Sequence, residues 1–416
     1  MQRVIPGKYI GQAKSNSSKS MMQRAVASAI LAEGITIINN PCKSDDSKAA
    51  LDVARSLGVL VSGDSTLTIT RKPELLTPKE ITCGESGFCA RLFPPLLGVI
   101  CDNIKINGKG TLTKRPMDFM VQTLHELGVE YALSNGKLPG QLSGALKGGN
   151  IVIDGSITSQ FLSGLLMALV KAKEDSIVQV ANLKSKGYID LTLDVMSKFG
   201  VNVEHQNYKD FHIPGNQNYT PCELTIEGDW SGAGFHLVGG AINGRATVKG
   251  LQLESKQPDK EILKAIRLAG ASISTSADSI TATDRTLQGF DFDATDCPDL
   301  FPPLAALAAN CNGTSRINGV NRLFSKESNR AESIMSALSN VGIQTQLKEN
   351  TMYIAGGEIS GGSIDSKNDH RIAMMGAILA INAKQPIEIS NTSSVNKSYR
   401  DFFQTLAQFG IQVETC

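Results

Sequence analysis

The fold is decided by ARSLGVLVS (residues 54–62) and by five later segments with the same pattern. These are LHELGVEYA (124–132), MSKFGVNVE (196–204), IRLAGASIS (266–274), LSNVGIQTQ (338–346) and LAQFGIQVE (406–414). In each, the end of an amphipathic helix pattern is followed by glycine and then by alternating residues that favour strand. A glycine at this place predicts a left-handed helix stop.

The glycines of these segments are almost evenly spaced along the chain. They are Gly58, Gly128, Gly200, Gly270, Gly342 and Gly410, and their separations are 70, 72, 70, 72 and 68 residues. A period near 70 is longer than that of solenoid repeats, and each period holds both helix and strand patterns. The spacing therefore predicts six copies of one mixed α/β repeat.

A second helix pattern recurs in step with the first and is apolar nearly all round. Examples are MMQRAVASAILAEG (21–34), SQFLSGLLMALVKA (159–172) and HRIAMMGAILAINAK (370–384). A helix without a broad polar face belongs inside a domain. A short strand pattern such as SIVQVANL (176–183) follows each of these helices. We therefore expect an inside-out α/β fold, with buried helices inside and sheets outside.

The chain is too long for one hydrophobic core. Its 416 residues exceed the roughly 250–300 at which single cores stop growing. Two domains of three repeats each are the economical arrangement. We assign residues 18–227 to one domain, and residues 1–17 with 228–416 to the other, which the N-terminal strand completes. The segment HIPGNQNYTP (212–221) marks the approach to the crossover.

Composition excludes several classes of protein. Lys and Arg number 41 against 40 Asp and Glu, a net charge of +1, so no general field attracts nucleic acid or a membrane surface. No stretch reaches the roughly 18 apolar residues of a membrane span, and the first residues lack a signal peptide pattern, so a cytoplasmic protein is expected. The eight cysteines and five histidines form no metal-binding motif, so we expect no metal.

Basic residues stand near the expected N-termini of the amphipathic helices, where cations are disfavoured. They are Lys43, Arg115, Lys186, Lys256, Lys326 and Lys397. One explanation is that each pairs with a neighbouring acid. The repetition instead favours a shared site for phosphate or carboxylate at a domain interface, occupied by small molecules with several negative charges.

Eight segments, in order along the chain, resemble motifs of the 5-enolpyruvylshikimate-3-phosphate (EPSP) synthase family. They are SKSMMQR (18–24), TKRPMD (113–118), GSITSQFLSGLLM (155–167), LKSKGYIDLTL (183–193), CPDLFPPLAALA (297–308), SKESNRAE (325–332), NDHRIAMM (368–375) and NKSYRDFF (396–403). The resemblance extends over essentially the whole chain. It implies two domains of three βαβαββ units each and transfer of an enolpyruvyl group from phosphoenolpyruvate to shikimate 3-phosphate. It also implies no metal or organic cofactor. With ligands bound between the two domains, closure on binding is expected, and we expect a monomer.

The matched motifs carry the family's site residues to positions in this chain. The shikimate 3-phosphate contacts they imply are Lys19, Ser20, Arg24, Thr158, Ser159, Gln160, Ser185, Asp299 and Lys326. The implied phosphoenolpyruvate contacts are Lys19, Gly87, Arg115, Gln160, Arg330, Arg371 and Lys397. Asp299, Glu327, Lys19 and Lys397 are the implied catalytic residues, with Asp299 taking the hydroxyl proton and Glu327 or Lys397 protonating the carbon.

One segment departs from the family pattern, and two rival functions stay open. GESGFCAR (84–91) stands where the family has GNAGTAMR, so Phe88 replaces threonine and Glu85 replaces asparagine. The nearest rival is a UDP-N-acetylglucosamine enolpyruvyl transferase, but its usual loop cysteine is missing from GKGTLTKRPMD (108–118). The other is a non-catalytic homologue that binds anions.

Overall fold

The computed structural model describes residues 1–416, which form two compact lobes. Lobe 1 consists of Met1–Asn16 and Glu227–Cys416, and lobe 2 of Ser17–Ile226. The chain therefore starts in lobe 1, builds all of lobe 2 and then returns. No helix is both long and apolar enough to cross a membrane.

Lobe 2 contains three four-stranded sheets of one design. In each, the first two strands are parallel and the other neighbours pair antiparallel. In spatial order, the first sheet consists of β14 (Glu223–Thr225), β3 (Gly34–Asn39), β5 (Thr66–Arg71) and β4 (Leu60–Gly63). The second consists of β6 (Glu80–Thr82), β7 (Asn103–Asn107), β9 (Lys137–Gly144) and β8 (Val129–Ser134). The third consists of β10 (Asn150–Asp154), β11 (Ser176–Ala181), β13 (Asp210–Ile213) and β12 (Glu204–Gln206).

Lobe 1 repeats this design three more times. Its first sheet consists of β2 (Tyr9–Lys14), β15 (Gly244–Lys249), β17 (Ser279–Thr283) and β16 (Ser272–Thr275). The second consists of β18 (Asp291–Asp293), β19 (Thr314–Asn318), β21 (Thr351–Ala355) and β20 (Gln344–Lys348). The third consists of β22 (Gly362–Asp365), β23 (Ile387–Ser390), β1 (Gln2–Val4) and β24 (Val413–Thr415). Six sheets of the same order confirm the sixfold repeat that the glycine spacing predicts.

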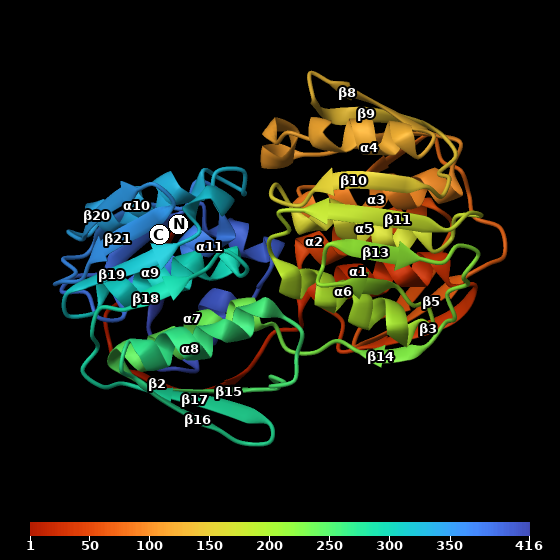
Figure 1. The fold of residues 1–416 in the computed structure, drawn as a ribbon. Coiled ribbons are helices and arrows are strands. Elements are labelled where there is room, and N and C mark those ends of the chain that lie inside the picture. The colour runs from red at the N-terminus through yellow and green to blue at the C-terminus, as the bar shows by residue number, and fades with distance from the viewer. The chain divides into compact units, whose positions relative to one another are not determined.

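The apolar helices fill the interior of each lobe, as predicted. They are α1 (Lys19–Leu31), α3 (Gly87–Ile100) and α5 (Ser159–Leu169) in lobe 2, and α7 (Trp230–Asn243), α9 (Phe301–Ala309) and α11 (His370–Ala380) in lobe 1. Nearly every residue of α5, α7, α9 and α11 is buried. Figure 1 shows α7 lying along the sheet formed by β2, β15, β17 and β16. These helices therefore form the hydrophobic cores of the two lobes.

The amphipathic helices end at the six glycines. They are α2 (Asp45–Ser56), α4 (Val121–Glu126), α6 (Lys186–Lys198), α8 (Ile262–Leu268), α10 (Arg330–Asn340) and α12 (Phe402–Ala407). All six glycines have positive φ, between 77° and 96°. Since an L-residue with a side chain is strained there, the predicted left-handed stop is confirmed.

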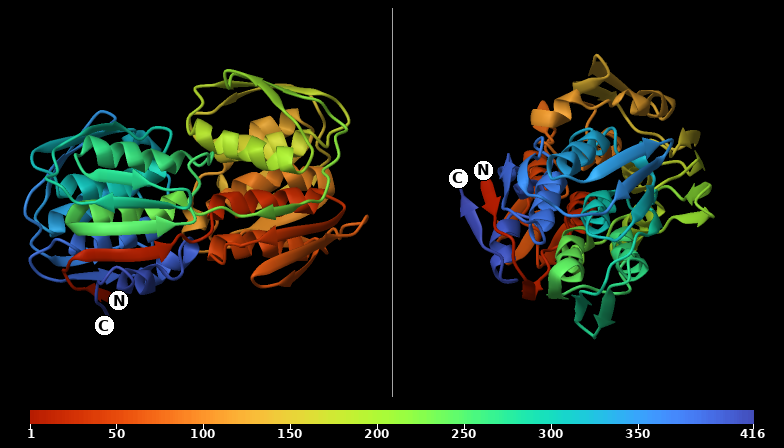
Figure 2. Two further views of the ribbon diagram at one scale, coloured as in Figure 1. Left: turned by 90° about the horizontal axis from the view of Figure 1, so that it is seen from below. Right: turned by 90° about the vertical axis from the view of Figure 1, so that its left-hand side faces the viewer.

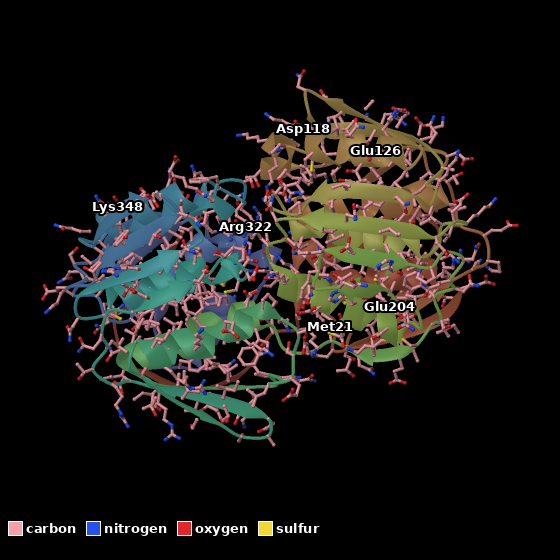
Figure 3. The ribbon with its side chains drawn as sticks, in the orientation of Figure 1. Met21, Asp118, Glu126, Glu204, Arg322 and Lys348 are labelled. Atoms are coloured by element: carbon pink, nitrogen blue, oxygen red, sulfur yellow. The ribbon has the colours of Figure 1, made fainter.

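Strands from distant parts of the sequence close the two lobes. β14 pairs in parallel with β3 and completes the first sheet of lobe 2. β2 pairs in parallel with β15, and β1 lies between β23 and β24. The two ends of the chain therefore lie side by side in lobe 1 (Figure 2). Exposed charged residues such as Glu126, Glu204 and Lys348 mark the outer elements of each lobe, whereas Met21 is buried in α1 (Figure 3).

His236 of α7 connects the first and last segments of the chain inside lobe 1. Its Nδ1 lies 2.6 Å from the Tyr9 hydroxyl and its Nε2 lies 3.0 Å from the Tyr399 hydroxyl. The ring also stacks on Phe402 and Phe409. A neutral imidazole has one donor and one acceptor, so one tyrosine donates and the other accepts. Burial lowers the pKa of His236 to about 3.

This burial predicts acid sensitivity of lobe 1. The unfolded chain binds a proton at His236 below about pH 6.5 while the folded chain does not, so stability is highest above that pH and falls toward pH 3. From about pH 7 to about pH 5 the group should lower the free energy of unfolding by about 2 kcal/mol. Urea unfolding, followed by the fluorescence of the single tryptophan, Trp230, measures this loss.

His236→Gln should lose about 2 kcal/mol less than the wild type over the same pH change. His125→Gln is the matched control, because His125 is exposed and pairs with the exposed Glu130. Equal acid losses in the wild type and the His236 variant would contradict the prediction.

Candidate active site

Arg330 is the centre of a buried ion-pair cluster in lobe 1. It is the first residue of α10, and its exposure is 0%. Its Nε donates to Asp369 Oδ2 at 2.9 Å, its Nη1 to Asp299 Oδ1 at 3.0 Å and its Nη2 to Glu327 Oε2 at 2.5 Å. Burial alone would lower the pKa of Arg330, but Asp369, Glu327 and Asp299 reverse the shift and raise it. The guanidinium is therefore permanently charged.

Asp299, the predicted base, binds three cations. It lies in the 3-10 turn η4 (Pro298–Leu300) directly before α9. Besides Arg330, Arg371 Nη2 donates to its Oδ2 at 2.9 Å and Lys326 Nζ lies 3.3 Å from its Oδ1. Burial lowers the pKa of Lys326, with Asp299 opposing the shift. Three cationic donors stabilise the ionised carboxylate, which is the form a general base requires.

The sequence motifs did not assign Arg322 to this cluster. This residue ends the turn η5 (Val320–Arg322) and is labelled in Figure 3. Burial lowers the pKa of Arg322, while Asp296 and Asp299 oppose the change, which places it within electrostatic reach of the proposed base. None of the eight recognised motifs includes it.

Three helices of lobe 1 begin at this cluster. Asp299 precedes α9, Arg330 begins α10, and Asp369 caps α11 by accepting from the backbone N–H of Arg371 at 3.0 Å. Nearby, Lys397 ends the turn η6 (Thr392–Lys397) and donates to the carbonyl of Asn368 at 2.8 Å. Helix N-termini carry partial positive charge. The cluster holds five cations, Lys326, Arg330, Arg371, Lys397 and Arg322, against four carboxylates, Asp296, Asp299, Glu327 and Asp369. The excess of positive charge favours anionic ligands.

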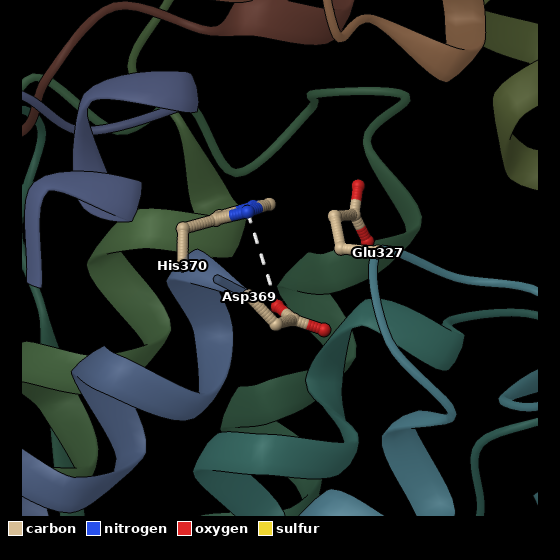
Figure 4. Close-up of side chains that lie close together, drawn as sticks. All are labelled: Glu327, Asp369 and His370. Carbon is tan, nitrogen blue, oxygen red and sulfur yellow. Dashed lines mark ion pairs between the residues drawn. The ribbon is translucent and has the colours of Figure 1, made fainter. Parts of the chain in front are cut away.

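Glu327, Asp369 and His370 bring potential metal ligands close together (Figure 4). Their ligand atoms lie within 4.8 Å of one another, and His370 Nδ1 lies 3.9 Å from Asp369 Oδ1. Both carboxylates already pair with the Arg330 guanidinium. A metal ion here would stand beside a buried cation, so the arrangement fits an ion-pair network and does not fit a metal centre.

In lobe 2, the start of α1 carries two of the predicted basic residues. Lys19 Nζ pairs with Asp46 Oδ2 at 2.8 Å. Arg24 lies one turn further, is 2% exposed and donates to the hydroxyl of Thr192 and to the carbonyls of Ser20 and Tyr188. Ser20 therefore contributes its carbonyl oxygen to fixing Arg24.

A second group of cations in lobe 2 surrounds Gly87, the first residue of α3. A Cβ placed on Gly87 would come within 2.5 Å of Arg115 Nη1 and 3.1 Å of Arg91 Nη1. Arg91 Nη1 donates to Gln160 Oε1 at 2.8 Å. Gly87, Arg115 and Gln160 were predicted site residues, and the structure brings them together around Arg91. A side chain at this position would displace the Arg115 guanidinium from its present place.

The predicted hydroxyl residues of lobe 2 lie at helix N-termini. Thr158 caps α5 by accepting from the N–H of Gln160 at 3.1 Å, and Ser159 begins that helix. Ser185 precedes α6 with φ 59° and ψ 45°, a left-handed conformation that is uncommon outside glycine. Such backbone strain is typical of functional sites.

The basic residues near the N-termini of the amphipathic helices first suggested an anion site, but their surroundings in the structure differ. Lys43 pairs with Asp64, and both side chains are largely exposed, so its position reflects a surface ion pair. Lys186 begins α6, and its ammonium lies 5.8 Å from the centre of the Tyr208 ring. Of these residues, Lys326 and Lys397 lie at the Arg330 cluster of lobe 1, and Arg115 lies beside Gly87 in lobe 2.

Comparison with known proteins identifies the family. The family model described as EPSP synthase (3-phosphoshikimate 1-carboxyvinyltransferase) matches residues 5–406. The chain belongs to the EPSP synthase family. A 3-phosphoshikimate 1-carboxyvinyltransferase of Clostridium novyi (strain NT) is 36% identical, covering 98% of this chain and 97% of that protein. Its counterpart in Clostridium kluyveri is 35% identical, covering 99% and 97%.

Solved structures show the same fold as this EPSP synthase family member. EPSP synthase from Acinetobacter baumannii matches with a TM-score of 0.84 at 24% identity, covering 100% of this chain and 99% of that one. The enolpyruvyl transferase NikO from Streptomyces tendae matches with a TM-score of 0.78 at 17% identity, covering 99% and 98%. The predicted inside-out α/β fold and the predicted family are both confirmed.

Breaking the Arg330 cluster should destabilise lobe 1. Asp369→Asn removes a carboxylate with 0% exposure from a buried guanidinium, so the free energy of unfolding should fall by about 3 kcal/mol. Urea unfolding followed by Trp230 fluorescence measures the change.

Glu358→Gln is the matched control, since it makes the same chemical change in the exposed pair with Lys384. It should cost less than about 1 kcal/mol. If the two variants lost the same stability, the central role of the buried cluster would be refuted.

Proposed function

We propose that this chain transfers the enolpyruvyl (1-carboxyvinyl) group of phosphoenolpyruvate to the 5-hydroxyl of shikimate 3-phosphate and releases phosphate. The observation that carries the proposal is the Asp299 carboxylate held by Lys326, Arg330 and Arg371 in a member of this family. This reaction is a step of the shikimate pathway, toward chorismate and the aromatic amino acids.

The substrates explain why so many cations gather on a chain that is neutral overall. Phosphoenolpyruvate and shikimate 3-phosphate each carry one phosphate and one carboxylate. Guanidinium groups pair with such oxygens in two-pronged contacts. Arg330 uses four hydrogen bonds on its carboxylate partners, which leaves one N–H of Nη1 for a ligand.

The reaction proceeds by addition followed by elimination. The 5-hydroxyl oxygen attacks C2 of phosphoenolpyruvate, Asp299 accepts the hydroxyl proton, and C3 receives a proton from Glu327 or Lys397. The resulting tetrahedral intermediate loses phosphate from C2 and a proton from C3, which restores the double bond. Asp299 lies among cations that keep it ionised before the attack. The choice between Glu327 and Lys397 stays open.

The proposed assignments draw on both lobes. The residues proposed to bind phosphoenolpyruvate are Lys19, Gly87, Arg115, Gln160, Arg330, Arg371 and Lys397. Those proposed to bind shikimate 3-phosphate are Lys19, Ser20, Arg24, Thr158, Ser159, Gln160, Ser185, Asp299 and Lys326. Lys19 and Lys397 join Asp299 and Glu327 as the proposed catalytic residues.

We also propose that the enzyme is a cytoplasmic monomer without a nucleic-acid partner and that it uses no organic cofactor or metal. The net charge of +1 supports the absence of a nucleic-acid partner, because nucleic-acid-binding proteins are usually basic. The chemistry needs only proton transfers and stabilised negative charge, both of which side chains supply.

The acceptor can be tested directly by measuring phosphate release from phosphoenolpyruvate. We expect release with shikimate 3-phosphate and none with UDP-N-acetylglucosamine. Release with only the sugar nucleotide would identify the rival transferase. Release with neither acceptor would identify a non-catalytic homologue, and either result would refute the proposal.

Replacing the proposed base should separate turnover from binding. Asp299→Ala should lower kcat by about two to four orders of magnitude, the usual contribution of a general base. Calorimetric titration should show that shikimate 3-phosphate still binds, with an affinity reduced only by the loss of the proposed Asp299 contact.

Asp291→Ala is the control, because Asp291 is an exposed residue of the same lobe that pairs only loosely with Arg316, at 3.5 Å. It should leave kcat unchanged. Turnover near the wild-type value in the Asp299 variant would show that another group takes the proton.

A further inference from the structure

Arg24 is a buried cation whose hydrogen-bond acceptors are all neutral. Its Nε donates to Thr192 Oγ1 at 2.7 Å and its Nη1 to the Ser20 carbonyl at 2.8 Å. Its Nη2 donates to the Tyr188 carbonyl at 3.1 Å and to Ser163 Oγ at 3.4 Å. Burial lowers the pKa of Arg24 to about 9. Unlike Arg330, this guanidinium has no carboxylate among its bonded partners.

Four hydrogen bonds use four of the five N–H groups of a guanidinium. One N–H of Nη1 is therefore left for a ligand. A buried cation with neutral partners gains most when an anion arrives to balance its charge. Arg24 is thus prepared for an anionic substrate, provided that its plane is held in one orientation.

The four hydrogen bonds set the direction of the guanidinium, and the ring of Phe88 adds a second restraint on its plane. The guanidinium carbon of Arg24 lies 4.4 Å from the centre of the Phe88 ring, and the Tyr188 ring is more distant at 6.0 Å. An aromatic face attracts a cation, and the attraction grows when water is excluded. Both Arg24 and Phe88 are almost fully buried.

Phe88 is itself fixed by the contact between α1 and α3. Ser86 caps α3 two residues before Phe88, and its hydroxyl accepts from Gln23 Nε2 at 2.8 Å. Gln23 also contacts Cys89 Sγ at 3.2 Å. Gln23 precedes Arg24 on α1, and Cys89 follows Phe88 on α3. The turn of α3 that carries Phe88 is therefore joined to the helix that carries Arg24.

We propose that Phe88 is a positioning residue for the acceptor substrate. Its ring holds the Arg24 guanidinium in the plane from which the remaining N–H reaches an anionic group of that substrate. This inference rests on the proposed function, through the assignment of Arg24 to shikimate 3-phosphate. It gives a role to one of the residues in which this chain departs from the family pattern.

The test removes the aromatic face and keeps an apolar side chain. Phe88→Leu should raise KM for shikimate 3-phosphate by about 3-fold to 30-fold, the range expected for a desolvated cation–π contact. KM for phosphoenolpyruvate and kcat should change less than about 2-fold, because the lost contact acts only through Arg24. Phe93→Leu is the matched control, since Phe93 is a buried residue of the same helix. It should lower thermal stability without changing either KM.

Two further variants separate positioning from packing. Phe88→Tyr keeps an aromatic face and should restore KM for shikimate 3-phosphate to near the wild-type value. In a double-mutant cycle, Phe88→Leu should have almost no further effect on that KM once Arg24→Gln has removed the cation. Equal changes in both KM values, no rescue by tyrosine, or additive effects in the cycle would each overturn the proposal.

The wild-type assay distinguishes the two possible failures. If the wild type releases no phosphate with shikimate 3-phosphate, the proposed function fails. If the wild type is active but Phe88→Leu behaves like Phe93→Leu, the function stands and the positioning role is rejected.

Discussion

The buried pairing of Arg330 with three carboxylates is the interaction on which the lobe 1 site depends. Asp299, Glu327 and Asp369 come from three separate segments, and one guanidinium fixes all of them. Leaving a charge at 0% exposure unpaired would lower the free energy of unfolding by several kcal/mol. The three segments that carry the carboxylates therefore stabilise one another. The proposed base and one candidate proton donor are therefore positioned by the same contact that joins the N-termini of α9, α10 and α11.

The two lobes treat their cations differently. In lobe 1 the arginines are bound by carboxylates, which set a fixed pattern of charge around Asp299. In lobe 2, Arg24 is bound by carbonyls and hydroxyls, and Arg91 by the amide oxygen of Gln160. Neutral acceptors orient a guanidinium without cancelling its charge. The charge of Arg330 in lobe 1 is thus balanced by bonded carboxylates, whereas the bonded acceptors of Arg24 in lobe 2 are all neutral.

The sequence predicted the repeats well because their signals are local. A glycine stop and an apolar helix face can be read within a few residues, and the positive φ of Gly342 follows directly from such a signal. Contacts between distant residues were not predictable in this way. Asp369 was part of a recognised motif, yet its partner Arg330 is 39 residues away, and no periodicity connects them. Arg91 was not assigned to the site from the sequence, because its partner Gln160 lies 69 residues away. The individual roles of the proposed substrate contacts stay predictions, because they depend on ligands.

The sheet that joins both ends of the chain has a consequence for synthesis on the ribosome. β14 completes lobe 2 once about half of the chain has been made, so that lobe can close early. β1 must wait for its neighbours β23 and β24, which are translated much later. At about 5–20 residues per second, this N-terminal strand stays unpaired for tens of seconds. Its exposed backbone edge is short, only Gln2–Val4, which limits the chance of pairing with a neighbouring nascent chain.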